Sequence, residues 1–146
     1  MATLTTTVQE SVTINGKLYG NTIEKTHASI EQVYQQVVNV GTSVQEIMGF
    51  ASTEKAGELA DGKLRYLRIT NTDADNFATI YYDIADTGND TAGFKLEAGC
   101  SMVITHDSVG FGTSAATISS LTQLDAIIAK ADTADVKLEI FIGLTA

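Results

Sequence analysis

Alternation with a period of two constrains this chain more than any other feature. In Thr3–Ile14 the even positions are mostly apolar, beginning with Leu4 and Val8, whereas the odd positions carry hydroxyl and amide groups. Successive side chains of a β-strand point to opposite faces, so the pattern predicts a strand with one apolar face. Val136–Leu144 alternates in the same way and predicts a closing strand with one core face.

Polar turn sequences predict where the strands reverse. Asn15-Gly16 favours a type I′ turn, so the first strand is expected to return at Lys17–Tyr19 as a hairpin. Leu64–Thr70 and Phe77–Ala85 are rich in β-forming residues and flank a polar segment, which predicts a second hairpin. A third hairpin is expected between Ala92–Leu96 and Ser101–Thr105, with Gly99 in its turn.

Other segments carry weaker patterns. Residues 21–31 have no clear period, and His27 among them is expected to be a solvated loop residue. Val33–Val40 and Val44–Phe50 predict further short strands, and 51–62 predicts a surface loop. Leu121–Ala131 fits both a helical stripe and a strand; we expect a short helical turn followed by a strand.

About eight short strands joined by Asn, Asp and Gly turns predict an all-β fold, an antiparallel β-sandwich with at most one short helix. The pattern leaves open whether the strand order is that of a jelly roll or another Greek key. A length of 146 residues is sufficient for one domain and one core, so we expect a single domain over 1–146, with residues 1–10 as an N-terminal arm.

Composition narrows the function. The chain has 9 Lys and Arg against 18 Asp and Glu, a net charge of −9 that would repel a phosphate backbone or anionic lipid. We therefore expect neither nucleic acid nor membrane as a partner. Cys100 is the single cysteine, so an intrachain disulfide or a cysteine-based zinc site cannot form. No signal peptide is expected at the N-terminus.

Four short patterns resemble catalytic, nucleotide-binding or calcium-binding motifs, and each has a simpler structural explanation. His106-Asp107-Ser108 resembles part of a catalytic triad, but adjacent residues of one strand do not reach triad geometry. Gly110–Ala115 spells GxGxxA without the strand–helix context of a nucleotide site. The acidic segments 73–76 and 86–97 lack the full calcium-loop pattern and suit turns. We expect no enzyme activity, cofactor or metal.

Aromatic and apolar residues off the core faces are better candidates for contact surfaces. Phe77 and Tyr81 lie on the face of their strand opposite Ile80, and Phe141 lies opposite the core face of the last strand. Side chains of this kind are covered either by a loop or by another subunit. The N-terminal strand has no Pro and no charge before Glu10, which suits pairing with a neighbouring sheet edge. The interface candidates are Leu4, Thr6, Val8, Phe77, Tyr81 and Phe141.

A further pattern extends over Arg65–Asn71, Phe77–Tyr82 and Phe94–Ile104, with the opening Ser11–Gly16 and the closing Ala131–Ile142. In these segments the chain resembles small virion structural proteins of tailed bacteriophages. It implies a β-sandwich that assembles on the particle, as capsid decoration (cement) proteins do, often as homotrimers. It supplies no catalytic residue to transfer.

The sequence thus leads us to expect a non-enzymatic virion protein. The first expectation is a decoration protein that stabilises the capsid across capsomer contacts, with the major capsid protein or another virion protein as partner and the chain itself as a homo-oligomer, a trimer by resemblance. One alternative is a structural protein of the neck, tail or fibre attachment. Another is a carbohydrate-binding module that uses Tyr66, Tyr81 or Tyr82.

Overall fold

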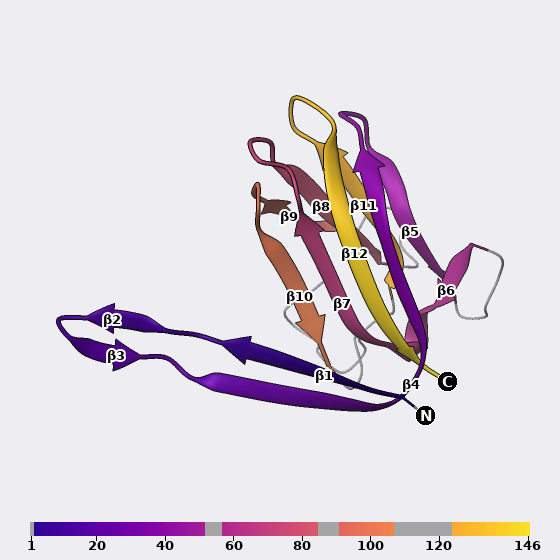
Figure 1. Ribbon diagram of the computed structural model, residues 1–146. Coiled ribbons are helices and arrows are strands. Elements are labelled where there is room, and N and C mark those ends of the chain that lie inside the picture. The colour runs from indigo at the N-terminus through magenta and orange to yellow at the C-terminus, as the bar shows by residue number, and fades with distance from the viewer. Residues whose placement is uncertain (1, 52–56, 85–90, 107–123) are drawn as a thin grey trace, which may run out of the picture.

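The computed structural model describes residues 2–51, 57–84, 91–106 and 124–146, which form a two-layered body and a long projecting hairpin (Figure 1). The one helical element in these ranges is a 3-10 turn, η1, at Asp61–Lys63. The all-β prediction is confirmed. The strands are β1 (Ala2–Gln9), β2 (Val12–Ile14), β3 (Lys17–Tyr19), β4 (Thr22–Val40), β5 (Gln45–Ala51), β6 (Glu58–Ala60), β7 (Leu64–Asn71), β8 (Ala78–Ile84), β9 (Thr91–Leu96), β10 (Ser101–Thr105), β11 (Leu124–Ala131) and β12 (Val136–Thr145).

The body consists of two stacked sheets. Sheet A has the order β1-β4-β12-β7-β10, and sheet C has the order β6-β5-β11-β8-β9. Within the body, each strand of one sheet is linked along the chain to its counterpart in the other sheet: β4 to β5, β7 to β8, β9 to β10, and β11 to β12. This is the strand order of an eight-stranded jelly roll, to which β1 and β6 add at the edges.

The core lies between the two sheets and is supplied by alternate residues. In β12, Leu138, Ile140 and Ile142 are fully buried, as the alternation of this segment predicts. They meet Ile80 of β8 and Ile127 of β11 from the facing sheet in one continuous cluster. Burial of apolar side chains at this density is the main stabilising term of the fold.

The first predicted hairpin is confirmed, whereas the second and third are wrong. Asn15 and Gly16 both have positive φ, and β2 pairs with β3 around them. The segments predicted to pair as the second and third hairpins instead lie in different sheets, since β7 pairs with β12 and β10, and β8 pairs with β11 and β9. Their polar connections cross from one sheet to the other.

A buried amide explains these crossings. Asn71 at the end of β7 is fully buried, and its Nδ2 donates to the carbonyl oxygens of Asn76 at 2.8 Å and Leu96 at 3.2 Å. Its Oδ1 accepts from the Asp73 N–H. One side chain therefore ties the connection that follows β7 to the end of β9.

Two further expectations are corrected. Residues 22–31, which lack a clear period, belong to the 19-residue strand β4. The segment 51–62 contains β6, which pairs with β5 in parallel, and the start of η1. The ambiguous segment Leu121–Ala131 is a strand from Leu124 onward, and the helical turn expected at its start falls on 121–123, outside the described residues.

Tyr82 gives the body a dependence on alkaline pH. Burial raises the pKa of this phenol well above its usual value, and its hydroxyl donates to the Met102 sulfur. The unfolded chain releases the proton near pH 10, so the stability that the buried phenol contributes is present below that pH and is lost as the pH rises above it. We expect Tyr82→Phe to unfold at a more constant denaturant concentration between about pH 9 and 11 than the wild type. An equally steep alkaline loss in the variant would contradict this.

Candidate functional site

The most unusual part of the molecule is the hairpin formed by β1, β2, β3 and the first half of β4. Leu4 faces His27 at its base and Ile14 faces Lys17 at its tip. The same register runs between these pairs, across a break where the Glu10 N–H donates to the Asn21 carbonyl. In Figure 1 this hairpin, which we call the arm, crosses the lower ends of β12, β7 and β10 and extends beyond them.

The arm begins at a sharp bend in β4. Ser29 has φ +60°, and the register of β1 against β4 shifts at the same point. After the bend, Ile30–Val40 pairs with β12 in the body, whereas Thr22–Ser29 pairs only with β1 among the described strands. The bend therefore folds the arm over the outer face of sheet A.

The base of the arm packs on that face. The Leu4 side chain lies against Gly143, where a Cβ would come within 3.1 Å of Leu4 Cδ2. His27 is buried, and its Nε2 lies 2.7 Å from the Thr105 hydroxyl of β10. The expectation of a solvated loop histidine is therefore wrong, because the arm carries this polar segment across the body.

Beyond the body, the same face of the arm is uncovered. Even positions of β1 and their partners share one face, so the face that buries Leu4 and His27 continues to the tip. The exposed fraction is 52% for Val12 and 54% for Ile14. The other large apolar members, all exposed, are Val8, Tyr19 and Ile23. The same register also puts Thr6 with Lys25 and Glu10 with Asn21 on this face, so its exposed apolar residues form two clusters, one of Val8 with Ile23 and one of Val12 with Tyr19 and Ile14. Exposed apolar clusters of this kind often mark an interaction surface.

The arm is also the electrically neutral part of an acidic chain. Residues 2–30 contain Lys17 and Lys25 against Glu10 and Glu24, whereas the whole chain has a net charge of −9. The surplus of acid therefore lies in the remainder of the chain. An acidic surface does not repel this arm.

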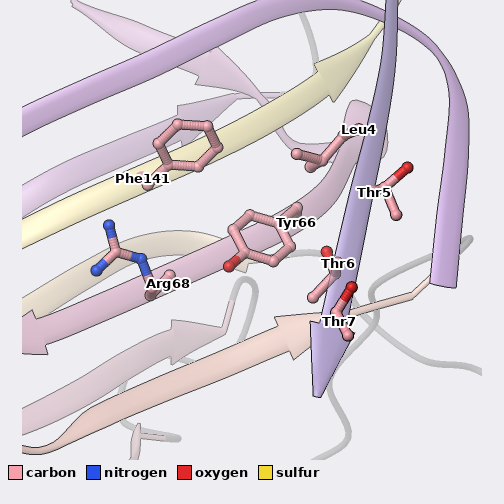
Figure 2. Close-up of a pocket in the computed structure, with 7 residues that line it drawn as sticks. All are labelled: Leu4, Thr5, Thr6, Thr7, Tyr66, Arg68 and Phe141. Carbon is pink, nitrogen blue, oxygen red and sulfur yellow. The ribbon is translucent and has the colours of Figure 1, made fainter. Parts of the chain in front are cut away.

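A recess of about 300 Å³ lies beside β1 on the outer face of sheet A. Figure 2 shows Tyr66, Arg68 and Phe141 on one side of it and Leu4–Thr7 of β1 on the other. The Tyr66 and Phe141 rings meet edge to face with centroids 5.7 Å apart, and Arg68 forms an ion pair with Glu139. The recess is thus floored by aromatic rings and walled by a strand edge.

The structure brings together three of the six interface candidates. Leu4, Thr6 and Phe141 are half-buried around the recess, while Val8 lies further along the arm and is exposed. Phe77 and Tyr81 belong to sheet C. Phe77 lies under the Lys95 ammonium at 4.0 Å, and Tyr81 covers Gly93, where a Cβ would come within 2.7 Å of its ring. Neighbours on the same sheet thus partly cover both rings.

The patterns that suggested chemistry have simpler explanations where they are described. Asp73 Oδ1 accepts from the N–H groups of Asn76 and Asp75, and these bonds lower the pKa of its carboxyl, as expected for a carboxylate that stabilises a turn. His106 lies exposed at the end of β10, and its N–H donates to the Arg65 carbonyl. Asp107, Ser108, the Gly110–Ala115 motif and the turn at 86–90 lie outside the described residues.

Within residues 2–51, 57–84, 91–106 and 124–146, no group of three or more His, Cys, Asp and Glu side chains is placed to hold a metal ion. No helix in those ranges is long and apolar enough to cross a membrane.

The fold and the site define a jelly-roll domain with a projecting β-hairpin arm. No protein family, characterised protein or solved structure has significant similarity to the chain.

Gly20 is the residue on which the arm depends most clearly. It has φ +137°, and a Cβ there would lie 2.0 Å from the Glu10 carbonyl oxygen. We expect Gly20→Ala to open the hairpin beyond Glu10 and to accelerate amide hydrogen exchange in β2 and β3, with the midpoint of thermal unfolding of the body unchanged. Gly41→Ala is the matched control, because Gly41 lies outside the arm, has no positive φ, and a Cβ there would meet only side-chain atoms at 3.6 Å or more. Equal exchange rates in the two variants would contradict this role of Gly20.

Proposed function

We propose that the protein is a non-enzymatic structural component of a virus particle and acts as a capsid decoration protein that binds across capsomer contacts. The observation that carries the proposal is the arm, whose uncovered apolar face runs from Val8 to Ile14 and back to Ile23. This face contributes nothing to the core of the body. Its exposure is explained if the arm is covered after assembly.

The marginal stability of the arm and its risk of aggregation support a role in assembly. A two-stranded hairpin is marginal in water by itself, and this one extends past the sheet that supports its base. Large apolar residues at its tip increase the risk of aggregation. A chain that gained nothing from them would be less prone to aggregate with polar residues at Val12 and Ile14.

The body fits the same role. A jelly roll is an architecture of viral capsid proteins and of lectins, although a fold alone does not fix a function. A particle presents many identical sites, so modest contact per copy becomes strong attachment when copies are linked. Within the body, the face of sheet C that carries Phe77 and Tyr81 is the candidate particle contact, and the acidic remainder keeps free copies apart in solution.

Two alternative functions can be distinguished from a capsid decoration protein. A position at the neck, tail or fibre attachment uses the same contact surfaces and differs only in location. A carbohydrate-binding module is less well supported, because two of its three candidate platforms are buried: Tyr82 lies in the core, and Tyr66 packs on Phe141. Tyr81 remains half-exposed.

Particle imaging tests the proposal. Virions purified from a culture that carries the gene are labelled with an antibody against the protein and viewed by electron microscopy. We expect regular labelling over the head; labelling confined to the neck or tail would support the first alternative. Mass spectrometry of the same particles provides the control, and absence of the chain from washed virions would contradict a virion role.

A further inference from the structure

We propose that two copies of this chain pair through the free edge of β1 about a two-fold axis, and that each arm lies across sheet A of the other copy. The inference rests on the proposed role of the arm as an assembly element and names its first partner. The pairing leaves the Phe77 and Tyr81 face of sheet C free for the particle.

The first observation is the unprotected edge of β1. Among the described strands, β1 pairs only with β4, so its other edge has unpaired backbone groups. Its sequence, ATLTTTVQ, contains neither a charge nor a proline. Proteins usually protect exposed edge strands with such residues, and an edge without them is a template for another strand.

The second observation is the space beside that edge. The recess along β1 is lined by Thr5 and Thr7 on one side and by Phe141 and Arg68 on the other (Figure 2). A strand added to β1 would therefore lie over the outer face of sheet A. The Thr6 hydroxyl is buried at this place without a hydrogen-bond partner.

The third observation is an apolar surface in the path of the added arm. On the outer face of sheet A, Phe141 faces Gln35 of β4, and the flanking pairs are Glu139 with Val37 and Gly143 with Val33. Val37 is 62% exposed and Val33 57%. Each arm thus has uncovered apolar residues on one face, and each body has two exposed valines, on either side of Gln35, on the sheet face that would receive a second arm.

Symmetry joins these observations. Two identical strands that pair antiparallel about a two-fold axis keep the same faces on the same side of the new sheet. The even face of β1, which packs Leu4 on its own body, would place the Val8 and Val12 positions of the second copy over the first body. A face-preserving register that pairs all but one residue of Ala2–Gln9 puts the axis at Thr5 or Thr6.

Charge permits the contact. The arm has two Lys and two Glu, so it meets the acidic body of a second copy without net repulsion. Two bodies of this chain would repel each other if they met directly. The neutral arm is therefore the part of the chain best suited to join two copies.

Sedimentation velocity of the full chain tests the pairing. We expect a species of twice the 15.5 kDa chain mass at micromolar concentration. Val12→Asp, on the covered face, and Val37→Asp, on the receiving patch, should each weaken association at least about tenfold, because each buries an unpaired charge. Leu18→Asp is the matched control: Leu18 is 69% exposed and belongs to the opposite face of the hairpin, so association should be unchanged.

A cysteine trap tests the strand register. In a Cys100→Ser background, Thr5→Cys with Thr7→Cys should give a disulfide-linked dimer, because residue 5 opposes residue 5 or 7 of the other copy. The control is Glu24→Cys with Thr26→Cys. These two residues of β4 lie opposite Thr7 and Thr5 within one chain, away from the free edge of β1, so the control should not cross-link two copies.

Several results would overturn the pairing: a chain that stays monomeric at all concentrations, a stable trimer, equal loss of association in Leu18→Asp and Val12→Asp, or no effect of Val37→Asp. Such results with virions that still label over the head would remove the pairing and leave the proposed function. A stable dimer that is absent from virions would support the pairing and contradict the proposed function.

Discussion

Asn71→Asp is expected to lower the free energy of unfolding at pH 7 by about 3–5 kcal/mol. The Asn71 amide donates to two carbonyl oxygens in a fully buried place. An aspartate there would present a carboxylate oxygen to both carbonyls, so two hydrogen bonds would be lost and a buried charge would be left unpaired. Urea denaturation at pH 7 measures the loss.

The pH dependence of this variant shows how much of the lost free energy of unfolding is due to the buried charge. Burial with the Asp73 N–H as the one donor shown at this side chain raises the pKa of the new carboxyl above its unfolded value, so the deficit should shrink as the pH falls toward about 4. Asn76→Ala is the control, since only its backbone oxygen accepts from Asn71. A deficit below about 1 kcal/mol at pH 7 would show that the amide does not hold the two connections together.

The second large effect contrasts two isoleucines that lie in strands of similar pattern. Ile140→Ala in β12 should cost about 2–5 kcal/mol, because Ile140 is fully buried between the sheets. Ile14→Ala at the tip of the arm should cost less than about 0.5 kcal/mol, since Ile14 is 54% exposed. Thermal or denaturant unfolding below the concentration at which copies associate measures both.

The contrast bears on function as well as on stability. If Ile14→Ala destabilised the isolated chain as much as Ile140→Ala, the apolar face of the arm would serve folding, and its exposure would need no partner. If the cost is small, that face has been retained for a purpose other than folding.

Features that depend on neighbouring residues could be predicted from the sequence. The alternation of Val136–Leu144 predicts the core face of β12, and Asn15-Gly16 predicts the first hairpin, because both depend on backbone geometry within a few residues. The all-β class follows from the number of such segments and from their spacing.

Features that depend on distant partners were predicted poorly. Asn71–Asn76 and Glu97–Cys100 look like hairpin turns because their polar side chains bond to nearby backbone, and the same chemistry suits a connection between sheets. Asn71 and the pairing of β7 with β12, 65 or more positions away, decide whether a hairpin turn or a connection between sheets forms. No local pattern carries that information.

The candidate interaction surface could be predicted from the sequence only in part. Leu4, Thr6 and Val8 were selected from their alternation, and that alternation continues through Val12 and Ile14, which would have indicated an arm longer than residues 1–10. His27 could not have been placed, because its polar neighbours hide a strand that becomes buried only where it crosses β10.

Hydrogen exchange at the tip of the arm is the most direct test of the account. The central claim is that the apolar face of the arm becomes covered by a partner, so protection of the amides of β2 and β3 should depend on assembly. We expect these amides to exchange quickly in dilute protein and to become at least about tenfold more protected as the concentration rises through the association range, while β12 stays protected throughout. Fast exchange at the tip at every concentration, in free protein and on virions alike, would contradict the claim.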